Sequence, residues 1–509
     1  MKVPTILKQR RFWIAFFIIL YLLPVWLFKY FPTQDGPAHL YNAQILRDYA
    51  SSDFFRQYLA LRLTLFPNWL SHLLEWGLLY LFPALITEKI FLSLYVILFP
   101  LGFFYFLDAV QPGRTLLGFL SFLFIFNYLF LLGFYNFVLT IPLFLFLLGY
   151  WWKKREQLGW KQVVVCNLLL VAIFFGHLVS YALAVGSMGL LALIYFRKRV
   201  KPILFTLVCV LPSTLLFFNY YIGSRVAGSI LPQLDGLRIV ALLARLFELN
   251  ILVSYTDLQQ WIAGVVAVIM FLLFEYTVWK DLHEGSDKGK KYPNDRDYFL
   301  APLLVFLVLY MILPSYIGPG GWLNDRLELF AVILLLALLR IGEGQRWDWL
   351  KGIIGMLVVA NAIYLVFEIG SLNRGLEEYT SGISQLQAHK IILPLFFDGY
   401  GESRNIGIYV NASNYYSLDN QSLNLGNYEV QYDYFPVMLK PGFQTPTNNS
   451  DWVQTIFWQP EAIDLCGYAS HVDYLLTWGA PDAQILDEIK RCYLPLYRQG
   501  RLALYTPRQ

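Results

Sequence analysis

The chain has 509 residues, of which 57% are hydrophobic and only 15% are charged. A soluble protein carries roughly 25% charged residues, so this composition excludes a single soluble globular domain and indicates an integral membrane protein. The formal net charge of +4 is too small to identify a partner, and no nucleic-acid partner is expected.

Apolar runs recur along the first 369 residues, and a membrane-spanning helix needs about 20 such residues. About eleven spans are expected, at residues 12–28, 89–107, 116–131, 134–150, 162–179, 180–196, 203–221, 258–279, 299–317, 327–340 and 350–369. Basic residues at 153–155, at 197–199 and along the tract 280–296 mark cytoplasmic loops. An odd number of spans then places the N-terminus in the cytoplasm and the C-terminus outside it.

The segment 66–82 is also apolar, but it contains His72 and Glu75 and is bracketed by Pro67 and Pro83. Counting it as a twelfth span would return the C-terminus to the cytoplasm. Polar side chains inside a bilayer are costly unless they face protein or water. We therefore expect an interfacial or half-buried helix at this place.

The sequence divides into a transmembrane domain at 1–369, with an external loop at 29–88, and an extracytoplasmic α/β domain at 370–509. In this tail, strands are expected at 405–410, 428–434, 472–478 and 502–505, and a helix at 483–492. An oxidising compartment would allow a disulfide between Cys466 and Cys492, and two buried free thiols are the alternative. Cys166 and Cys209 lie in apolar runs and are expected to be packing residues.

The first external loop carries an acidic residue, Asp35, just beyond the first span and before a Gly-Pro pair. This position is typical of a helix N-cap, and His39 follows close enough to share a helix face with Asp35. The carboxylate could take a proton from an acceptor hydroxyl, or Asp35 and His39 could help to hold a divalent cation. An ordinary capping Asp with a surface His is the alternative.

The loop 313–326 is rich in Gly and Pro, which indicates irregular backbone of the kind tolerated where it lines a cavity. Arg326 opens the next helix on the external side, and its guanidinium can hold a phosphate in a bidentate fork. The alternative is an Arg that reaches toward lipid head groups and pairs with Asp325 or Glu328.

Other polar residues are expected at the same external level. His177 lies at the turn between two spans, and Asn136 lies close to the outer end of a span. Arg225, Arg238 and Arg245 are expected on a solvated amphipathic helix, and anion binding is the alternative. The sequence contains no P-loop, no dinucleotide-binding glycine motif and no HExxH metal pair.

The segments TQDGPAHLYNAQIL, FPNWLSHLL, GFYNF, GHLVSY and WLNDRLELF, together with the external tail, resemble the GT-C superfamily of membrane glycosyltransferases. The similarity is closest to bacterial members related to protein mannosyltransferases and lipid A aminoarabinose transferases. It implies transfer of a sugar from a polyprenyl-phosphate donor to an extracytoplasmic lipid, glycan or protein at the inner membrane. It also implies Asp35 as the catalytic carboxylate and Arg326 as the ligand of the donor phosphate. His39, His177, Asn136 and Asp325 would line the cavity.

The common loop of that superfamily has an acidic pair, whereas here Gly36 follows Asp35. The second carboxylate and the need for a metal are therefore left open. A glycan polymerase or ligase with lipid-diphosphate donors would also need external arginines, but not the acidic first loop. A flippase would place polar groups at mid-membrane, where most of the expected spans are uninterrupted Leu, Phe, Ile and Val. A non-catalytic assembly factor that keeps the scaffold is the last alternative.

Overall fold

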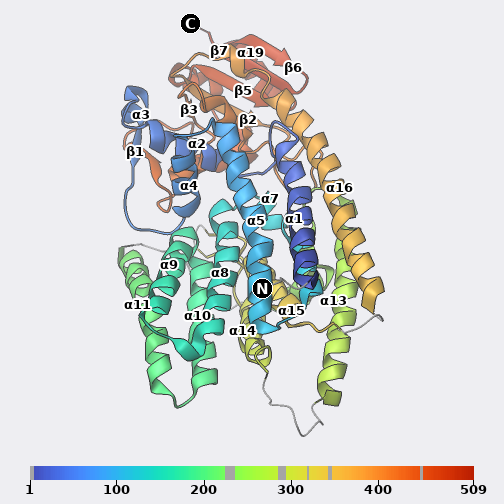
Figure 1. Ribbon diagram of the computed structural model, residues 1–509. Coiled ribbons are helices and arrows are strands. Elements are labelled where there is room, and N and C mark those ends of the chain that lie inside the picture. The colour runs from blue at the N-terminus through green and yellow to red at the C-terminus, as the bar shows by residue number, and fades with distance from the viewer. Residues whose placement is uncertain are drawn as a thin grey trace.

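A computed structural model describes residues 5–223, 235–284, 294–317, 320–341, 347–447 and 451–508. Arg225 and residues 285–293 of the basic tract lie outside these ranges. Long helices form the body of the molecule, and the strands gather at one end of it with the C-terminus (Figure 1).

Seven helices among the described residues are long and apolar enough to cross a membrane. They are α1 (Thr5–Trp26), α5 (Ala84–Val110), α8 (Tyr135–Lys154), α10 (Leu178–Phe196), α11 (Val200–Gly223), α13 (Asp257–Glu284) and α16 (Asp348–Tyr379). The shorter helices α9 (Trp160–Gly176), α14 (Leu300–Ile312) and α15 (Leu323–Leu338) occupy three further expected spans. The multi-pass helical class is confirmed, while the count of eleven stays a prediction.

The expected span 116–131 is not one continuous helix. It folds as α6 (Thr115–Leu120), a 3₁₀ turn (Ser121–Phe124) and α7 (Tyr128–Leu131). The break has a local cause, because the Asn127 side chain accepts a hydrogen bond from the Phe130 amide and caps α7. The same side chain donates to the Phe124 carbonyl at 2.9 Å, which ends the preceding turn.

Three short helices of the first external loop lie at the same end as the strands (Figure 1). They are α2 (Gly36–Asp48), α3 (Asp53–Tyr58) and α4 (Leu70–Leu78). Helix α4 has nine residues, too few to cross a bilayer, as expected for the segment 66–82. A fourth short helix, α12 (Gly236–Glu248), follows the long α11.

The tail contains a five-stranded sheet with the order β3-β2-β5-β7-β6. Its strands are β2 (Ile391–Phe396), β3 (Leu423–Asn424), β5 (Tyr474–Trp478), β6 (Tyr493–Gln499) and β7 (Leu502–Pro507). β2 is parallel to β3 and β5, and β7 is antiparallel to β5 and β6. The tail helices are α17 (Trp452–Trp458), α18 (Leu465–Tyr468) and α19 (Ala483–Cys492). Helix α16 continues through residue 370 without a break, so the boundary at 369/370 stays a prediction.

Two expected strands of the tail are wrong. Residues 405–410 form turns, because the Asn405 amide bonds to the Ser254 carbonyl and not to a neighbouring strand. Residues 428–434 begin with a 3₁₀ turn (Tyr428–Gln431), whose Glu429 amide donates to the Asn427 side chain. The structure places a strand instead at β2, which carries Pro394 in its interior.

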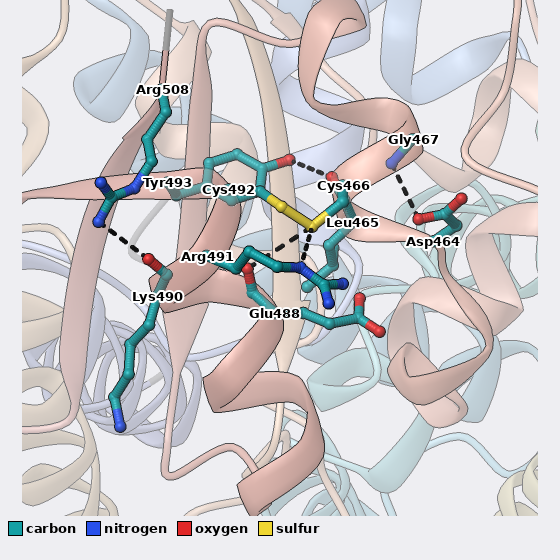
Figure 2. Close-up of a disulfide and its surroundings, with 10 residues drawn as sticks. All are labelled: Asp464, Leu465, Cys466, Gly467, Glu488, Lys490, Arg491, Cys492, Tyr493 and Arg508. Atoms are coloured by element: carbon teal, nitrogen blue, oxygen red, sulfur yellow. Dashed lines mark hydrogen bonds between the residues drawn. A yellow bond between two sulfur atoms is a disulfide. The ribbon is translucent and has the colours of Figure 1, made fainter.

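The tail is joined to the first external loop by backbone pairing. Strand β1 (Leu59–Leu61) is antiparallel to β4 (Val437–Leu439) of the tail, with Leu59 opposite Leu439. Within the tail, the structure pairs Cys466 of α18 with Cys492 at the end of α19 in a disulfide (Figure 2). The first external loop and the tail therefore form one continuous structure at this end of the molecule.

Candidate active site between the first external loop and the tail

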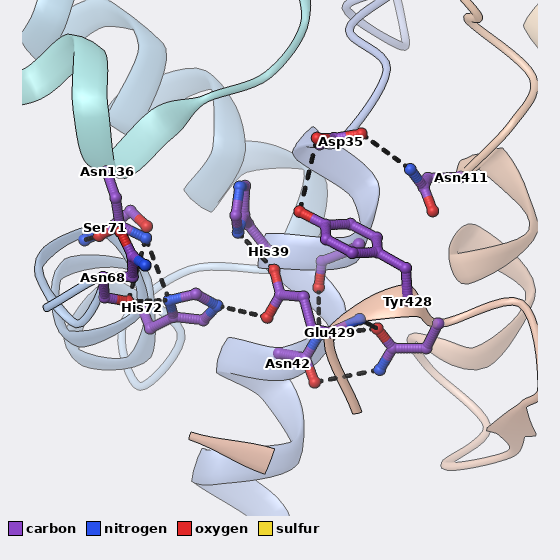
Figure 3. A network of polar contacts seen from close by, with 12 residues as sticks. Asp35, His39, Asn42, Asn68, Ser71, His72, Asn136, Asn411, Tyr428 and Glu429 are labelled. Carbon is purple, nitrogen blue, oxygen red and sulfur yellow. Dashed lines mark hydrogen bonds and ion pairs between the residues drawn. The ribbon is translucent and has the colours of Figure 1, made fainter. Parts of the chain in front are cut away.

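Asp35 occupies the N-cap position of α2, but its side chain makes no capping hydrogen bond. The expected capping role is therefore wrong, and the buried carboxylate is available for other contacts. It accepts hydrogen bonds from Asn411 at 2.9 Å, from Gln34 at 3.3 Å and from the Tyr428 hydroxyl at 3.5 Å. Two of these donors belong to the tail, so the tail covers Asp35 (Figure 3).

Burial raises the pKa of the Asp35 carboxyl to about 6, while the nearby His39 opposes this rise. The charged form loses solvation in this site and recovers only part of it from the three donors. A carboxyl with a pKa in this range can accept a proton near neutral pH and release it again. This property fits a general base better than a permanent structural charge.

Glycine at position 36 is required by a close approach of two chain segments. A Cβ atom at Gly36 would lie 2.2 Å from the Tyr135 hydroxyl, and one at Gly133 would lie 2.7 Å from the Asp35 amide nitrogen. Gly133 also has a φ of +79°, a conformation that favours glycine. There is no room for a second acidic side chain directly after Asp35, which explains the departure from an acidic pair.

A carboxylate from the tail lies next to this position. Glu429 is fully buried between two histidines, with Oε1 2.5 Å from His39 Nδ1 and Oε2 2.8 Å from His72 Nε2 (Figure 3). Burial alone would raise the pKa of Glu429, but the two histidines lower it to about 2. The three side chains could hold a metal ion, and Asp35 is not one of them.

Glu75 is a second buried carboxyl in this region, on α4 one turn after His72. Neither of its oxygens has a hydrogen-bond partner among the residues that the structure describes. Burial raises the pKa of Glu75 well above its ordinary value, and Glu88 and Glu429 add to the rise. A buried carboxyl without partners is costly to keep ionised, so it needs either a proton or a nearby cation.

Arg326 lies at the start of α15 and is half-buried. Its guanidinium carbon stands 4.9 Å from the centre of the Phe134 ring and 5.4 Å from that of Phe137. One terminal nitrogen donates to the Gly321 carbonyl. Within the described part of the chain, no carboxylate lies at ion-pair distance from Arg326. The guanidinium is thus held in place but keeps donors available for an anion.

The two acidic residues near Arg326 in the sequence interact with other residues. Asp325 pairs with Arg245 at 2.5 Å, and Glu328 accepts a hydrogen bond from the Ile251 amide. The alternative in which Arg326 pairs with Asp325 or Glu328 is therefore wrong. Arg238 donates to the Met311 carbonyl at 2.7 Å, so α12 binds this region through its arginines and is not simply a solvated helix.

His177 lies near Arg326, whereas Asn136 lies near His72. His177 ends α9 and caps α10, accepting a hydrogen bond from the Val179 amide, and its ring packs on Phe137 at 5.2 Å. It therefore lies on the Arg326 side of the site. Asn136 is buried, accepts from the Ser71 amide at 2.8 Å and donates to the Asn68 carbonyl at 3.1 Å. Asn136 supports the start of α4 and the ring of His72.

One short segment, residues 131–137, contacts both Asp35 and Arg326. The carbonyl of Leu132 accepts a hydrogen bond from the Asp35 amide at 3.0 Å. Two residues later lies Phe134, whose ring packs against the guanidinium of Arg326. Asp35 and Arg326 are 291 positions apart in the sequence (326 minus 35), yet both contact this segment.

Sequence reasoning did not include His72, Glu75 or Glu429 among the site residues. His72 and Glu75 could have been found, because polar residues in an apolar segment are functional candidates. Glu429 carries no comparable signal, since it lies in a polar tail with many acidic residues.

No family model and no curated protein sequence matches the chain. Among solved structures, the chain is similar to ArnT from Cupriavidus metallidurans bound to undecaprenyl phosphate, with 11% identity and a TM-score of 0.52 over 97% of each chain. The apo state of the same protein matches with 10% identity and a TM-score of 0.52, again over 97% of each chain. At this identity the likeness is one of fold, and the expected fold, a polytopic helical body with a C-terminal α/β tail, is confirmed.

Proposed function

We propose that this chain transfers a sugar from a polyprenyl-phosphate donor to an acceptor on the extracytoplasmic side of a cell membrane. The proposal depends above all on the segment 131–137, which holds the backbone of Asp35 on one side and the guanidinium of Arg326 on the other. A base for the acceptor and a cation for the donor are thereby tied to one structural element.

In the proposed reaction, the acceptor hydroxyl attacks the anomeric carbon of the donor sugar. Its oxygen forms the new glycosidic bond while its proton passes to the Asp35 carboxylate. The bond between the anomeric carbon and the phosphate oxygen breaks, and the lipid phosphate leaves with one more negative charge. Arg326 stabilises that charge, an effect typically worth about 3–4 kcal/mol in a preorganised site.

The fold supports this proposal, because ArnT with the same fold has been solved with undecaprenyl phosphate bound. The distribution of charge supports the orientation. The connection between α10 and α11, which carries Arg197, Lys198 and Arg199, lies at the end opposite the tail (Figure 1). Basic residues favour the cytoplasmic side. We therefore propose that the N-terminus lies in the cytoplasm and the tail outside it, in a protein of the inner membrane.

Binding of undecaprenyl phosphate by the purified full-length chain tests the role of Arg326. We expect Arg326→Ala to weaken binding by about 10- to 100-fold, the equivalent of a lost charge-assisted hydrogen bond. Arg326→Lys should recover only part of this loss, since a Lys cannot form the planar fork. The matched control is Arg374→Ala, an exposed arginine on α16. Equal affinity of wild type and Arg326→Ala would contradict the proposal.

The glycan product of cells tests the catalytic role of Asp35. Wild type and Asp35→Asn are compared after both proteins are shown to reach the membrane in equal amounts. We expect the product to disappear in the variant, because an amide cannot accept the proton. An unchanged product would refute the role of Asp35, and a product that accumulates on the cytoplasmic side would indicate transport.

A further inference from the structure

Three buried side chains from distant parts of the sequence meet at the junction of the first external loop and the tail. His39 comes from α2, His72 from α4 and Glu429 from the 3₁₀ turn of the tail. Their nearest ligand atoms all lie within 4.8 Å of one another, and each residue is at most 3% exposed. Figure 3 shows Glu429 reaching between the two imidazole rings.

We propose that His39, His72 and Glu429 bind a divalent transition-metal ion, with Zn²⁺ preferred, which fastens the tail to the first external loop. Two imidazole nitrogens and one carboxylate oxygen suit Zn²⁺ and its neighbours in the series, whereas Mg²⁺ and Ca²⁺ select oxygen ligands. The proposal does not depend on the sugar-transfer reaction.

The contacts of His72 Nδ1 favour the tautomer that suits a metal ligand, because the carbonyl oxygen beside it is closer than its other neighbour, the Asn136 amide nitrogen at 3.5 Å. His72 Nδ1 lies 3.1 Å from the Asn68 carbonyl oxygen, which can only accept a hydrogen bond. In a neutral imidazole, the hydrogen on Nδ1 leaves Nε2 with a free lone pair. That lone pair points at Glu429 Oε2, 2.8 Å away, so two acceptors face each other unless a proton or a cation lies between them. Histidine ligands of metals are commonly oriented by this kind of outer hydrogen bond.

The second carboxylate oxygen of Glu429 also faces a histidine nitrogen, here without a hydrogen bond of acceptable geometry. His39 Nδ1 and Glu429 Oε1 are 2.5 Å apart, yet neither atom has a hydrogen-bond partner of acceptable geometry. Zinc binds nitrogen and oxygen ligands at about 2.0–2.2 Å, so ligand atoms around a tetrahedral ion lie roughly 3.3 Å apart. The two contacts of Glu429, at 2.5 Å and 2.8 Å, are shorter than this value, so a bound ion would require side-chain rotations that widen both.

Two neighbouring residues complete the environment. Glu75 is buried on α4 without a hydrogen-bond partner among the described residues, so a cation bound nearby would lower the cost of ionising it. Asn136 holds the start of α4 through the Ser71 amide and the Asn68 carbonyl, and so fixes His72. With three protein ligands, a fourth position would remain for water, as in zinc sites that keep an open position.

Metal content measured on the purified full-length chain tests the proposal directly. The protein is stripped with a chelator, supplied with Zn²⁺ or Mg²⁺, and freed of excess metal. We expect about one equivalent of bound Zn²⁺ and no retained Mg²⁺ in the wild type. Glu429→Gln and His72→Gln, which approximate the shapes of the original side chains, should weaken Zn²⁺ binding at least about tenfold. The control His471→Ala removes an exposed histidine and should bind like the wild type.

A second measurement needs no variant and therefore does not depend on the folding of one. Co²⁺ added to the stripped wild type should give the visible absorption of a low-coordinate site, and Zn²⁺ should abolish it by competition. Failure of the wild type to retain Zn²⁺, or equal retention by wild type and Glu429→Gln, would overturn the proposal. Since neither readout is an activity, either result leaves the proposed function to its own tests.

Discussion

The carboxylate of Asp325 lies 2.5 Å from the guanidinium of Arg245, although Arg326 is its immediate neighbour in the sequence. Asp325 is buried, whereas the Arg245 side chain is 42% exposed and reaches in from α12. The pair engages the Asp325 carboxylate, which forms no ion pair with Arg326 among the described residues. In this way α12 helps to preserve Arg326 as a ligand for an anion.

Removing Arg245 should therefore weaken donor binding indirectly. In Arg245→Ala, the unpaired Asp325 would turn toward Arg326 and compete with the lipid phosphate. We expect undecaprenyl phosphate to bind about 3- to 10-fold more weakly, consistent with a coupling of roughly 1 kcal/mol between neighbouring charges. The double variant Arg245→Ala/Asp325→Asn should restore affinity, since the competing charge is gone. Additive losses in the double variant would contradict this explanation.

The activity should depend on the ionisation of Asp35. Because burial raises the pKa of this carboxyl to about 6, the base form is lost as the pH falls below that value. We expect kcat/KM to fall about tenfold per pH unit below pH 6 and to level off above it. Asp35→Asn should lower activity by at least about 100-fold at pH 7 and above. A profile that is flat between pH 5 and 7 would show that Asp35 is not the base.

Glu75 should make the metal-free protein less stable as the pH rises. Its folded pKa lies well above the ordinary 4.5, so the folded state binds the proton more tightly than the unfolded state. The stability contributed by the neutral carboxyl is then complete below pH 4.5 and declines as the pH rises above it.

Glu75→Gln removes this dependence and should stabilise the metal-free protein at pH 8 by about 1–3 kcal/mol. Thermal unfolding of the stripped protein at pH 5 and pH 8 measures the effect. Glu461→Gln, a change at an exposed carboxyl of the tail, serves as the control. If wild type and Glu75→Gln lose the same stability between the two pH values, Glu75 is not the cause.

The disulfide between Cys466 and Cys492 should stabilise the tail. It closes a loop with a sequence separation of 26 residues, for which chain-entropy arguments give about 3.5 kcal/mol. In the variant with both residues changed to Ala, limited proteolysis should cut the region around α18 and α19 more readily. Cys166→Ala/Cys209→Ala, in the membrane helices, is the matched control. Equal protease sensitivity of wild type and the tail variant would contradict the prediction.

Features governed by local sequence were predicted well. The helix 483–492 is present with its expected limits, since Asp482 caps it and Lys490 and Arg491 lie in its last turn. The turn at His177 and the short helix within 66–82 also follow from local signals. In β2, by contrast, Pro394 argues against a central strand, and its pairing with β3 and β5 depends on distant residues.

The site was only partly accessible from the sequence. Asp35 and Arg326 stand out by residue type and position, and their catalytic roles remain predictions. Their surroundings come from distant parts of the sequence. Asn411 and Tyr428 of the tail donate hydrogen bonds to Asp35. Arg245 of α12 forms the ion pair with Asp325. Glu429 could not be recognised as a site residue from the sequence, because its partner His72 is 357 positions away.

The pairing of β1 with β4 has a consequence for the biosynthesis of the protein. A ribosome adds roughly 5–20 residues per second, so the 357 positions from His72 to Glu429 take roughly 20–70 s to make. During that time the first external loop has already left the ribosome but lacks the strand and the carboxylate that complete it. Any truncation before β4 should yield inserted helices with an unfinished outer surface, a form that membrane proteases would recognise.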